Sequence, residues 1–114
     1  MRNRDVTGSN PVVPTIMDDQ EVEKLYEDVW AYCGEDHQID IFIEEMSELT
    51  KEFLKARREG KVFSKKVYRE LADVAICLDQ VMDRLEDRGK EMKVVDAVKY
   101  KQERLKKRLD EKSL

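Results

Sequence analysis

Cysteine, histidine, proline and glycine are all scarce in this chain. Its 114 residues include two cysteines, one histidine, two prolines and four glycines. Two cysteines are too few for a disulfide framework, and one histidine with two distant cysteines argues against a structural zinc site. The low glycine and proline content favours helices over a turn-dense β fold.

Long apolar runs are missing as well. No run approaches the ~18 residues that a membrane span needs, and the N-terminus lacks the apolar core of a signal peptide. We therefore expect a cytoplasmic protein without a membrane partner, in which Cys33 and Cys77 are buried thiols.

Charge of both signs is abundant, with a small acidic excess. Lys and Arg number 22 against 26 Asp and Glu, so the formal charge is −4. This balance argues against a general nucleic-acid binder, whose affinity depends on cation–phosphate contacts. Because 40% of the residues are hydrophobic, the chain has enough apolar surface to fold as one domain.

The first 16 residues differ in character from the rest. Both prolines and one of the four glycines fall there, and no helical or strand period is present. We expect residues 1–16 to be a flexible leader outside the fold and residues 17–114 to form the domain.

Three glycines divide the remaining chain into segments with a helical period. Gly34, Gly60 and Gly89 each follow such a segment, where a left-handed C-cap residue is favoured, and Ser64 is a candidate N-cap. The predicted helices are 18–33, 36–59, 64–87 and 91–112. Because the connections are short, we expect an all-α protomer of the antiparallel four-helix bundle type.

The apolar residues of the last three predicted helices recur at i, i+3, i+4 and i+7. We interpret them as the core: Phe42, Met46, Leu49, Phe53, Val67, Leu71, Val74, Leu78, Leu85, Val94, Val98, Leu105 and Leu109. Ile39, Ile41 and Ile43 add apolar surface that a small monomer has difficulty hiding, so we expect a homo-oligomer.

Two pairs of carboxylates stand beside these stripes. Glu45 and Glu48 are three residues apart, as are Glu70 and Asp73, and at about 100° per residue both pairs fall on the same side of their stripes. In antiparallel helices the four would converge along one groove, whereas Glu44 points away from it. Such a cluster has two interpretations: a salt-bridged, solvated face, or a site for Mg²⁺ with Mn²⁺ as a possible substitute.

The last predicted helix carries a cationic counterpart. Lys101 and Arg104 lie at the corresponding angles from its apolar stripe. They are either ordinary basic residues near a helix C-terminus or a phosphate-binding pair.

These motifs resemble those of a known enzyme family. Glu44-Glu45-x-x-Glu48, followed after 21 residues by Glu70-x-x-Asp73, resembles the signature of the MazG-like all-α nucleoside triphosphate pyrophosphohydrolases. The resemblance covers roughly residues 28–109 and includes the basic segment KQERLKKRL.

The resemblance implies Mg²⁺-dependent hydrolysis of a (deoxy)nucleoside triphosphate to the monophosphate and pyrophosphate. It assigns the metal to Glu45, Glu48, Glu70 and Asp73. Glu45 and Glu48 would thereby act in catalysis, and Glu44 would orient or deprotonate a water. The triphosphate would be held by Lys101 and Arg104.

The resemblance also places base-contacting groups at Trp30 and Gln38, although a large aromatic such as Trp30 more often packs in a core. A single short domain favours the homodimeric or homotetrameric branch of the family. Alternatives that stay open are a phosphoribosyl-ATP pyrophosphohydrolase, a dUTP- or dCTP-specific enzyme, and a non-catalytic helical assembly module.

Overall fold

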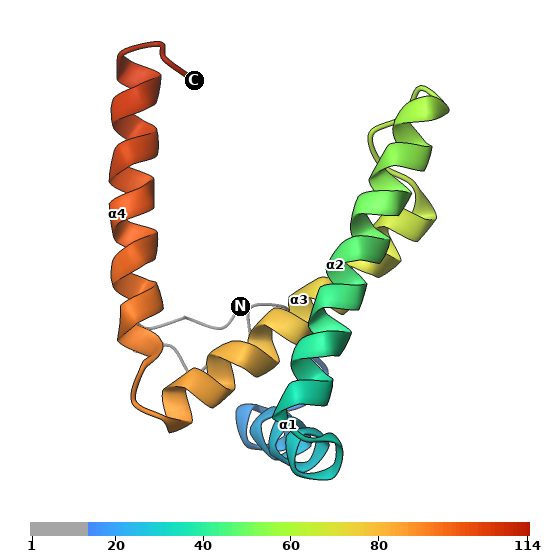
Figure 1. Cartoon of the computed structure of the whole chain (residues 1–114), viewed down its shortest axis with the longest axis vertical. Coiled ribbons are helices and arrows are strands. Elements are labelled where there is room, and N and C mark those ends of the chain that lie inside the picture. Colours follow the sequence, from blue (N-terminus) through green and yellow to red (C-terminus); the bar gives the residue numbers. More distant parts are fainter. Residues whose placement is uncertain (1–13) are drawn as a thin grey trace.

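The computed structural model describes residues 14–114, and this part of the chain is helical without a strand (Figure 1). Four helices follow one another: α1 (Asp19–Cys33), α2 (Glu35–Arg58), α3 (Lys65–Asp87) and α4 (Glu91–Asp110). The all-α class and the four helices are thereby confirmed. Residues 1–13 of the predicted leader lie outside the described residues, and residues 14–16 precede α1 without helical structure.

Local sequence signals set the helix ends. Asp18 caps α1 by accepting a hydrogen bond from the Glu21 N–H at 2.8 Å, and Ser64 caps α3 through the Val67 N–H at 3.2 Å. All three predicted glycines have positive φ, with Gly60 at 77°. This is the left-handed region that glycine enters without steric cost, so the chain turns there.

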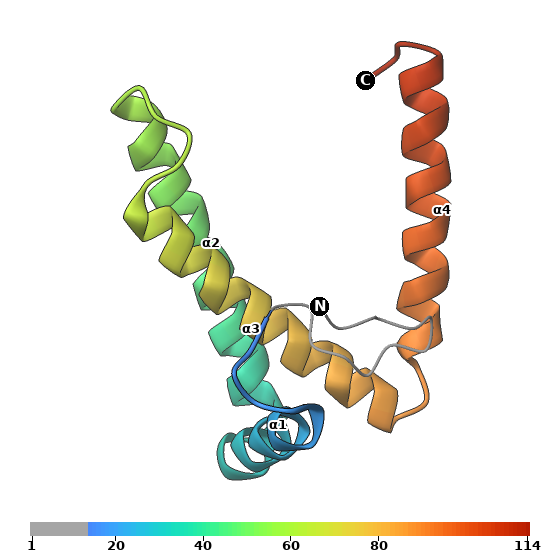
Figure 2. The same cartoon turned by 180° about the vertical axis from the view of Figure 1, so that it is seen from behind.

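α2 and α3 form the centre of the fold. They are joined by a short turn and lie side by side along most of their lengths, while α1 crosses them near the start of α2 (Figures 1 and 2). The buried apolar side chains come from these three helices: Val22, Tyr26, Trp30, Ala56, Val67 and Cys77. Val67 is the largest side chain that is fully buried.

The buried face of α2 is rotated from the one that the sequence predicts. Gln38, Glu52 and Ala56 are buried, whereas Met46 is 42% exposed. On α3, Leu71 and Leu78 are exposed to a similar extent. The prediction that these three apolar residues are core is therefore wrong for the single chain, because the seam between α2 and α3 does not run along the centre of the apolar stripe.

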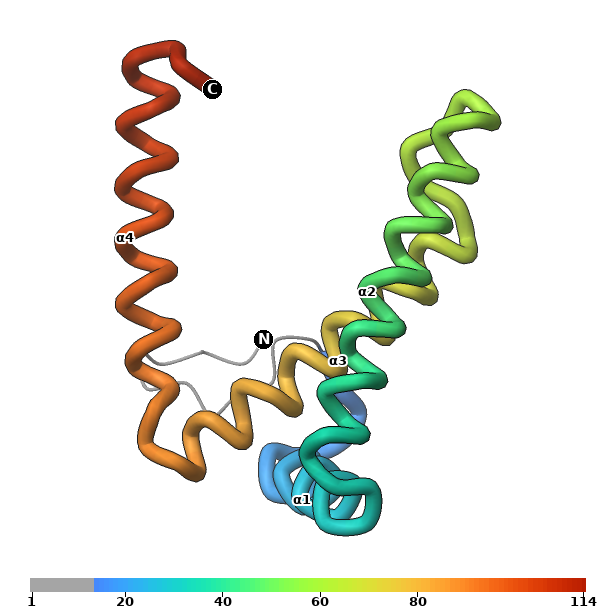
Figure 3. The backbone as a smooth tube through the Cα atoms, viewed as in Figure 1, coloured from blue at the N-terminus to red at the C-terminus, as the bar shows by residue number. Residues whose placement is uncertain are grey.

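α4 leaves the packed helices after a three-residue turn and extends away from α2 (Figure 3). Among the helices it contacts only α3, and none of its residues is buried. Its apolar residues Val98, Leu105 and Leu109 are about half exposed, because α4 packs on no other helix along its length. The prediction that they are core is therefore wrong for the single chain. The antiparallel packing of four helices and the oligomer stay predictions.

No helix within residues 14–114 combines the length and apolar character needed to cross a membrane.

Candidate metal centre and adjoining cleft

Three carboxylates converge where the middle of α2 faces the first half of α3. Glu45 of α2 and Glu70 and Asp73 of α3 each place one carboxylate oxygen within 4.8 Å of the others. The two α3 residues meet because a spacing of three puts them on one helical face, and the α2–α3 packing brings Glu45 opposite them. The structure therefore brings together three of the four carboxylates predicted as metal ligands.

The charges of this cluster oppose one another. Burial raises the pKa of the Glu45 carboxyl above its ordinary value, and the negative charges of Asp73 and Glu70 raise it further. Burial likewise raises the pKa of the Cys77 thiol, with Glu45 and Asp73 as the next causes. No Lys or Arg of residues 14–114 forms an ion pair with Glu45, Glu70 or Asp73.

One oxygen of the cluster lacks a hydrogen-bond partner. Glu70 Oε2 is buried, and nothing in the described part of the chain donates to it. A buried carboxylate oxygen without a donor is costly, and a cation or an ordered water would relieve that cost. This atom is therefore available to an ordered water or to a cation.

Glu48 and Glu44 stand outside the three-carboxylate group. Glu48 Oε1 lies 3.6 Å from Lys51 Nζ on the same helix. Glu44 is exposed, as its predicted direction away from the groove requires. Their catalytic roles stay predictions, and Glu48 would have to leave Lys51 to join the cluster.

A further α2 carboxylate lies on the packed face. Glu52 is 8% exposed and its Oε1 accepts a hydrogen bond from Lys55 Nζ at 3.3 Å. Its spacing of seven from Glu45 puts both on one side of α2, a signal that sequence reasoning passed over. Because Lys55 neutralises the charge of the Glu52 carboxylate, we interpret the two residues as a structural ion pair.

The predicted phosphate-binding residues are not beside the carboxylates of their own chain. Lys101 and Arg104 lie on α4, which does not contact α2. Both are exposed, and Lys101 Nζ lies 5.9 Å from the ring centroid of Tyr100. Their role in binding phosphate stays a prediction.

The predicted nucleotide-contacting residues do meet. Trp30 Nε1 and Gln38 Nε2 each donate a hydrogen bond at 3.0 Å to the same oxygen, Oε1 of Gln80. Trp30 and Gln38 are both buried. Most of the Trp30 side chain is therefore packed in the interior, as its interpretation as a packing residue requires. Gln80, which sequence reasoning missed, ties α1 and α2 to α3.

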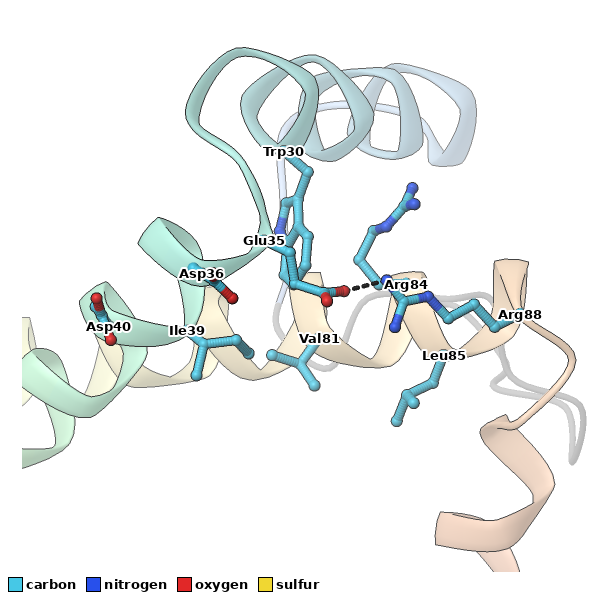
Figure 4. Close-up of a pocket in the computed structure, with 9 residues that line it drawn as sticks. All are labelled: Trp30, Glu35, Asp36, Ile39, Asp40, Val81, Arg84, Leu85 and Arg88. Carbon is cyan, nitrogen blue, oxygen red and sulfur yellow. Dashed lines mark hydrogen bonds and ion pairs between the residues drawn. The ribbon is translucent and has the colours of Figure 1, made fainter.

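A cleft of about 500 Å³ opens beside this hydrogen-bonded trio (Figure 4). Trp30 and Arg84 line one part of it, and the guanidinium of Arg84 lies 5.7 Å from the Trp30 ring centroid. Ile39 and Val81 supply an apolar part, and Arg88 forms an ion pair with Glu35 at the rim. Neither arginine belongs to a motif, which is why the sequence did not single them out.

The cleft and the carboxylates share one seam. Gln38 and Glu45 are seven residues apart on α2, so they lie on the same helical face, about 10 Å apart along the axis. Besides the two arginines, Glu35, Asp36 and Asp40 line the cleft. The arrangement thus combines a cleft of mixed charge, with an aromatic ring, and a carboxylate cluster suited to a hard cation.

Another polar contact fixes α1 near this seam. Tyr26 Oη donates to Asp79 Oδ2 at 3.3 Å, and both residues are buried. Burial raises the pKa of the Tyr26 hydroxyl, and the negative charge of Asp79 raises it further. This contact holds α1 against α3 and thereby helps to place Trp30 at the cleft.

Comparisons with protein-family models, with curated proteins and with solved structures gave no match to this chain.

Proposed function

We propose that this protein hydrolyses a (deoxy)nucleoside triphosphate to the nucleoside monophosphate and pyrophosphate with the help of Mg²⁺. The observation that carries the proposal is the convergence of Glu45, Glu70 and Asp73 at the α2–α3 seam. The resemblance of the two acidic motifs to the MazG-like pyrophosphohydrolases supplies the reaction type.

The residues present fit a hard divalent cation. The three carboxylate oxygens lie within 4.8 Å of one another, so small side-chain rotations would bring them to the ~3–4 Å that separates ligands of one Mg²⁺ bound at about 2.0–2.1 Å. All-oxygen donors suit Mg²⁺ or Mn²⁺, and the unpartnered Glu70 Oε2 is an available donor atom. When bound, the ion would neutralise phosphate charge and acidify water.

The remaining chemistry belongs to the chain itself. In the reaction, the oxygen of a water forms a bond to phosphorus, the α–β phosphoanhydride bond breaks, and pyrophosphate leaves. Glu44 is the proposed group for orienting that water and accepting its proton, since it lies on the same turn of α2 as Glu45. Glu48 is the proposed fourth ligand of the cation, which it would reach by leaving Lys51. Lys101 and Arg104 are proposed to bind the phosphates.

The neighbouring cleft is the proposed place for the base and sugar. It has an aromatic ring at Trp30, the guanidinium of Arg84 and an apolar wall, and the Trp30–Gln80–Gln38 hydrogen bonds lie beside it. Such a mixture of stacking surface and a few placed polar groups is typical of small-molecule sites. Because the cleft follows the same seam as the carboxylates, one extended nucleotide could occupy both.

The test is pyrophosphate release from a panel of NTPs and dNTPs, measured with Mg²⁺ or with EDTA. Glu70→Gln and Asp73→Asn should each abolish Mg²⁺-dependent release while the helical content stays unchanged. Glu59→Gln is the matched control, because it removes an exposed carboxylate at the end of α2 away from the cluster. Release that persists in both site variants, or its absence from every nucleotide, would overturn the proposal.

A non-catalytic assembly module is the second candidate, favoured by one observation. α4 has no buried residue although its apolar side chains repeat along one face, as expected for a helix that binds a partner. This candidate predicts no hydrolysis and no thermal stabilisation by Mg²⁺. In either case we propose a homodimer or homotetramer in the cytoplasm, where Cys33 and Cys77, both free in the structure, would stay reduced.

A further inference from the structure

The turn between α2 and α3, together with the helix ends that it joins, is strongly basic. Residues 51–69, here called the hairpin tip, contain eight basic and two acidic residues, a formal charge of +6. Residues 18–50 before it contain 12 acidic residues and one basic residue, and residues 70–87 after it contain six acidic residues and one basic residue. Charge is therefore segregated along the α2–α3 pair, although the net charge of the whole chain is only −4.

The cations of the hairpin tip are open to a partner. All eight basic side chains are exposed. The two acidic residues are already paired, Glu52 with Lys55 at 3.3 Å and Glu59 with Lys61 at 3.9 Å. Five of the basic residues form no ion pair within residues 14–114: Arg57, Arg58, Lys65, Lys66 and Arg69. The hairpin tip thus carries a surplus of positive charge that attracts an anionic partner.

The hairpin tip also exposes apolar side chains. Val62 and Phe63, two consecutive residues of the turn, are 62% and 53% exposed, and Leu54 and Tyr68 on the adjoining helices are exposed to a similar extent. Turns between helices are normally polar. Exposed apolar surface bordered by charged residues marks a site of interaction with a protein or a membrane.

Aromatic contacts hold part of this apolar surface in place. The ring of Phe63 stacks on that of Tyr68 with the centroids 6.2 Å apart, and it meets the ring of Phe53 edge-on at 6.3 Å. Phe53 belongs to α2 and Tyr68 to α3, so the three rings fix the turn against both helices. The apolar surface is therefore part of an ordered hairpin end.

The hairpin tip projects from the rest of the structure. The α2–α3 turn is the end of the pair farther from α1, which crosses near the start of α2 (Figures 1 and 2). α4 contacts only α3 and begins beyond the opposite end of that helix. An end that projects in this way can approach a flat surface.

We propose that the hairpin tip docks on an anionic lipid bilayer, with its exposed apolar side chains in the interfacial region and its basic side chains on the lipid headgroups. Clusters of about four to eight Lys and Arg residues are typical of proteins that bind anionic lipids. Aromatic rings favour the bilayer interface, and the long stems of Lys and Arg pack on apolar surface while their charges stay among the headgroups.

A single-stranded nucleic acid would also use cations and aromatic rings. Two features favour lipid over this partner. Leu54 and Val62 are aliphatic and offer no stacking face, but they gain from leaving water in a bilayer. Phe63 and Tyr68 already stack on each other, so each ring has one face occupied.

The proposal goes beyond the proposed function and holds whether or not the protein is a hydrolase. It departs from the expectation that the chain has no membrane partner. That expectation rests on the lack of long apolar runs, which a spanning segment needs but a protein bound to the bilayer surface does not.

The experiment is flotation of the full chain, without nucleotide, with vesicles of phosphatidylcholine that contain or lack phosphatidylserine. The wild type should bind the vesicles with phosphatidylserine at least about tenfold more tightly than those without it. Added NaCl should weaken the binding, because it screens the charges. Circular dichroism checks the helical content of every variant below.

One pair of substitutions tests the basic side chains. Lys65→Gln with Lys66→Gln should weaken binding to the anionic vesicles about tenfold. Lys93→Gln with Lys99→Gln is the matched control, because it removes two exposed lysines of α4 and changes the net charge equally. An equal loss in both variants would show attraction by net charge alone and would overturn docking through the hairpin tip.

A second pair tests the apolar side chains. Leu54→Gln with Val62→Gln should also weaken the binding about tenfold, and both residues are exposed, so the chain should still fold. Leu25→Gln with Tyr32→Gln, at exposed apolar residues of α1, is the control and should leave the binding unchanged.

Fluorescence anisotropy with a labelled single-stranded oligonucleotide tests the other partner. Binding to the oligonucleotide without flotation on anionic vesicles would overturn the proposal in favour of a nucleic acid. Absence of binding to both, or flotation that the Leu54/Val62 pair leaves unchanged, would overturn it as well.

Discussion

Trp30 on α1 and Gln38 on α2 are joined through a single atom, because both donate to Oε1 of Gln80 at 3.0 Å. One α3 side chain therefore links three helices at the edge of the cleft. Since Trp30 and Gln38 are both buried, their N–H groups depend on this oxygen.

Replacing Gln80 with methionine should lower the free energy of unfolding by about 2–3 kcal/mol. The substitution keeps the side-chain length but leaves two buried donors unpaired, and each such donor costs about 1–3 kcal/mol. Gln20→Met, at an exposed position, should change stability by less than about 0.5 kcal/mol. Urea unfolding followed by circular dichroism measures both, and equal values for the two variants would contradict the role given to Gln80.

Saturating Mg²⁺ should raise the thermal unfolding midpoint of the wild type. At about 100 times the dissociation constant, binding to the folded state alone contributes about 2.7 kcal/mol, or a shift of roughly 10 °C. Asp73→Asn should lose most of this shift, whereas Glu59→Gln should keep it, because only Asp73 belongs to the carboxylate cluster. NaCl at matched ionic strength controls for screening, and an equal shift with NaCl would show that no specific site exists.

Stability should fall as the pH rises through the titration of Asp83. Burial and, after it, the negative charges of Asp87, Glu23 and Glu27 together raise the pKa of this carboxyl from 3.8 to about 6. The folded state therefore binds the proton more tightly than the unfolded state. The resulting stabilisation is complete below about pH 4 and is lost as the pH passes through about 6.

Asp83→Asn removes this titration and should make the protein more stable than the wild type at pH 8, by about 1 kcal/mol after allowance for solvent screening. The difference should vanish near pH 4. Asp28→Asn on the exposed side of α1 is the control. Unfolding free energies measured at several pH values test the prediction, which fails if the two variants follow the same pH dependence.

Val67→Ala should destabilise the fold by about 2 kcal/mol. Val67 of α3 is fully buried, so the truncation removes apolar contact and leaves a cavity. The same truncation at Val62, which is 62% exposed, should cost less than about 0.5 kcal/mol. Denaturant unfolding compares the two, and a similar loss at both positions would place the core elsewhere.

The sequence by itself determined the class of the fold and the bounds of its helices. Ser64 and Gly60 act on their own turn of chain, through a side-chain cap and a positive φ, so their effect is readable without tertiary structure. The spacing of three between Glu70 and Asp73 likewise guarantees a shared face on any α-helix.

Only the tertiary structure decided which carboxylates meet. The sequence makes Glu45 and Glu48 equally good candidates for metal ligands. In the structure, however, Glu45 faces α3 and Glu48 lies beside Lys51. The two positions differ by about 60° around α2, and the angle of the seam is set by how two whole helices pack. A rotation this small also left Met46 exposed.

The direction of α4 could not be predicted from the sequence either, because it depends on how whole helices pack. Its apolar stripe shows that Val98 and Leu105 require a partner surface, but periodicity does not say which surface that is. The three-residue turn after α3 directs α4 away from α1 and α2 of the same chain. Where its apolar face packs is decided by surfaces that are distant in the sequence.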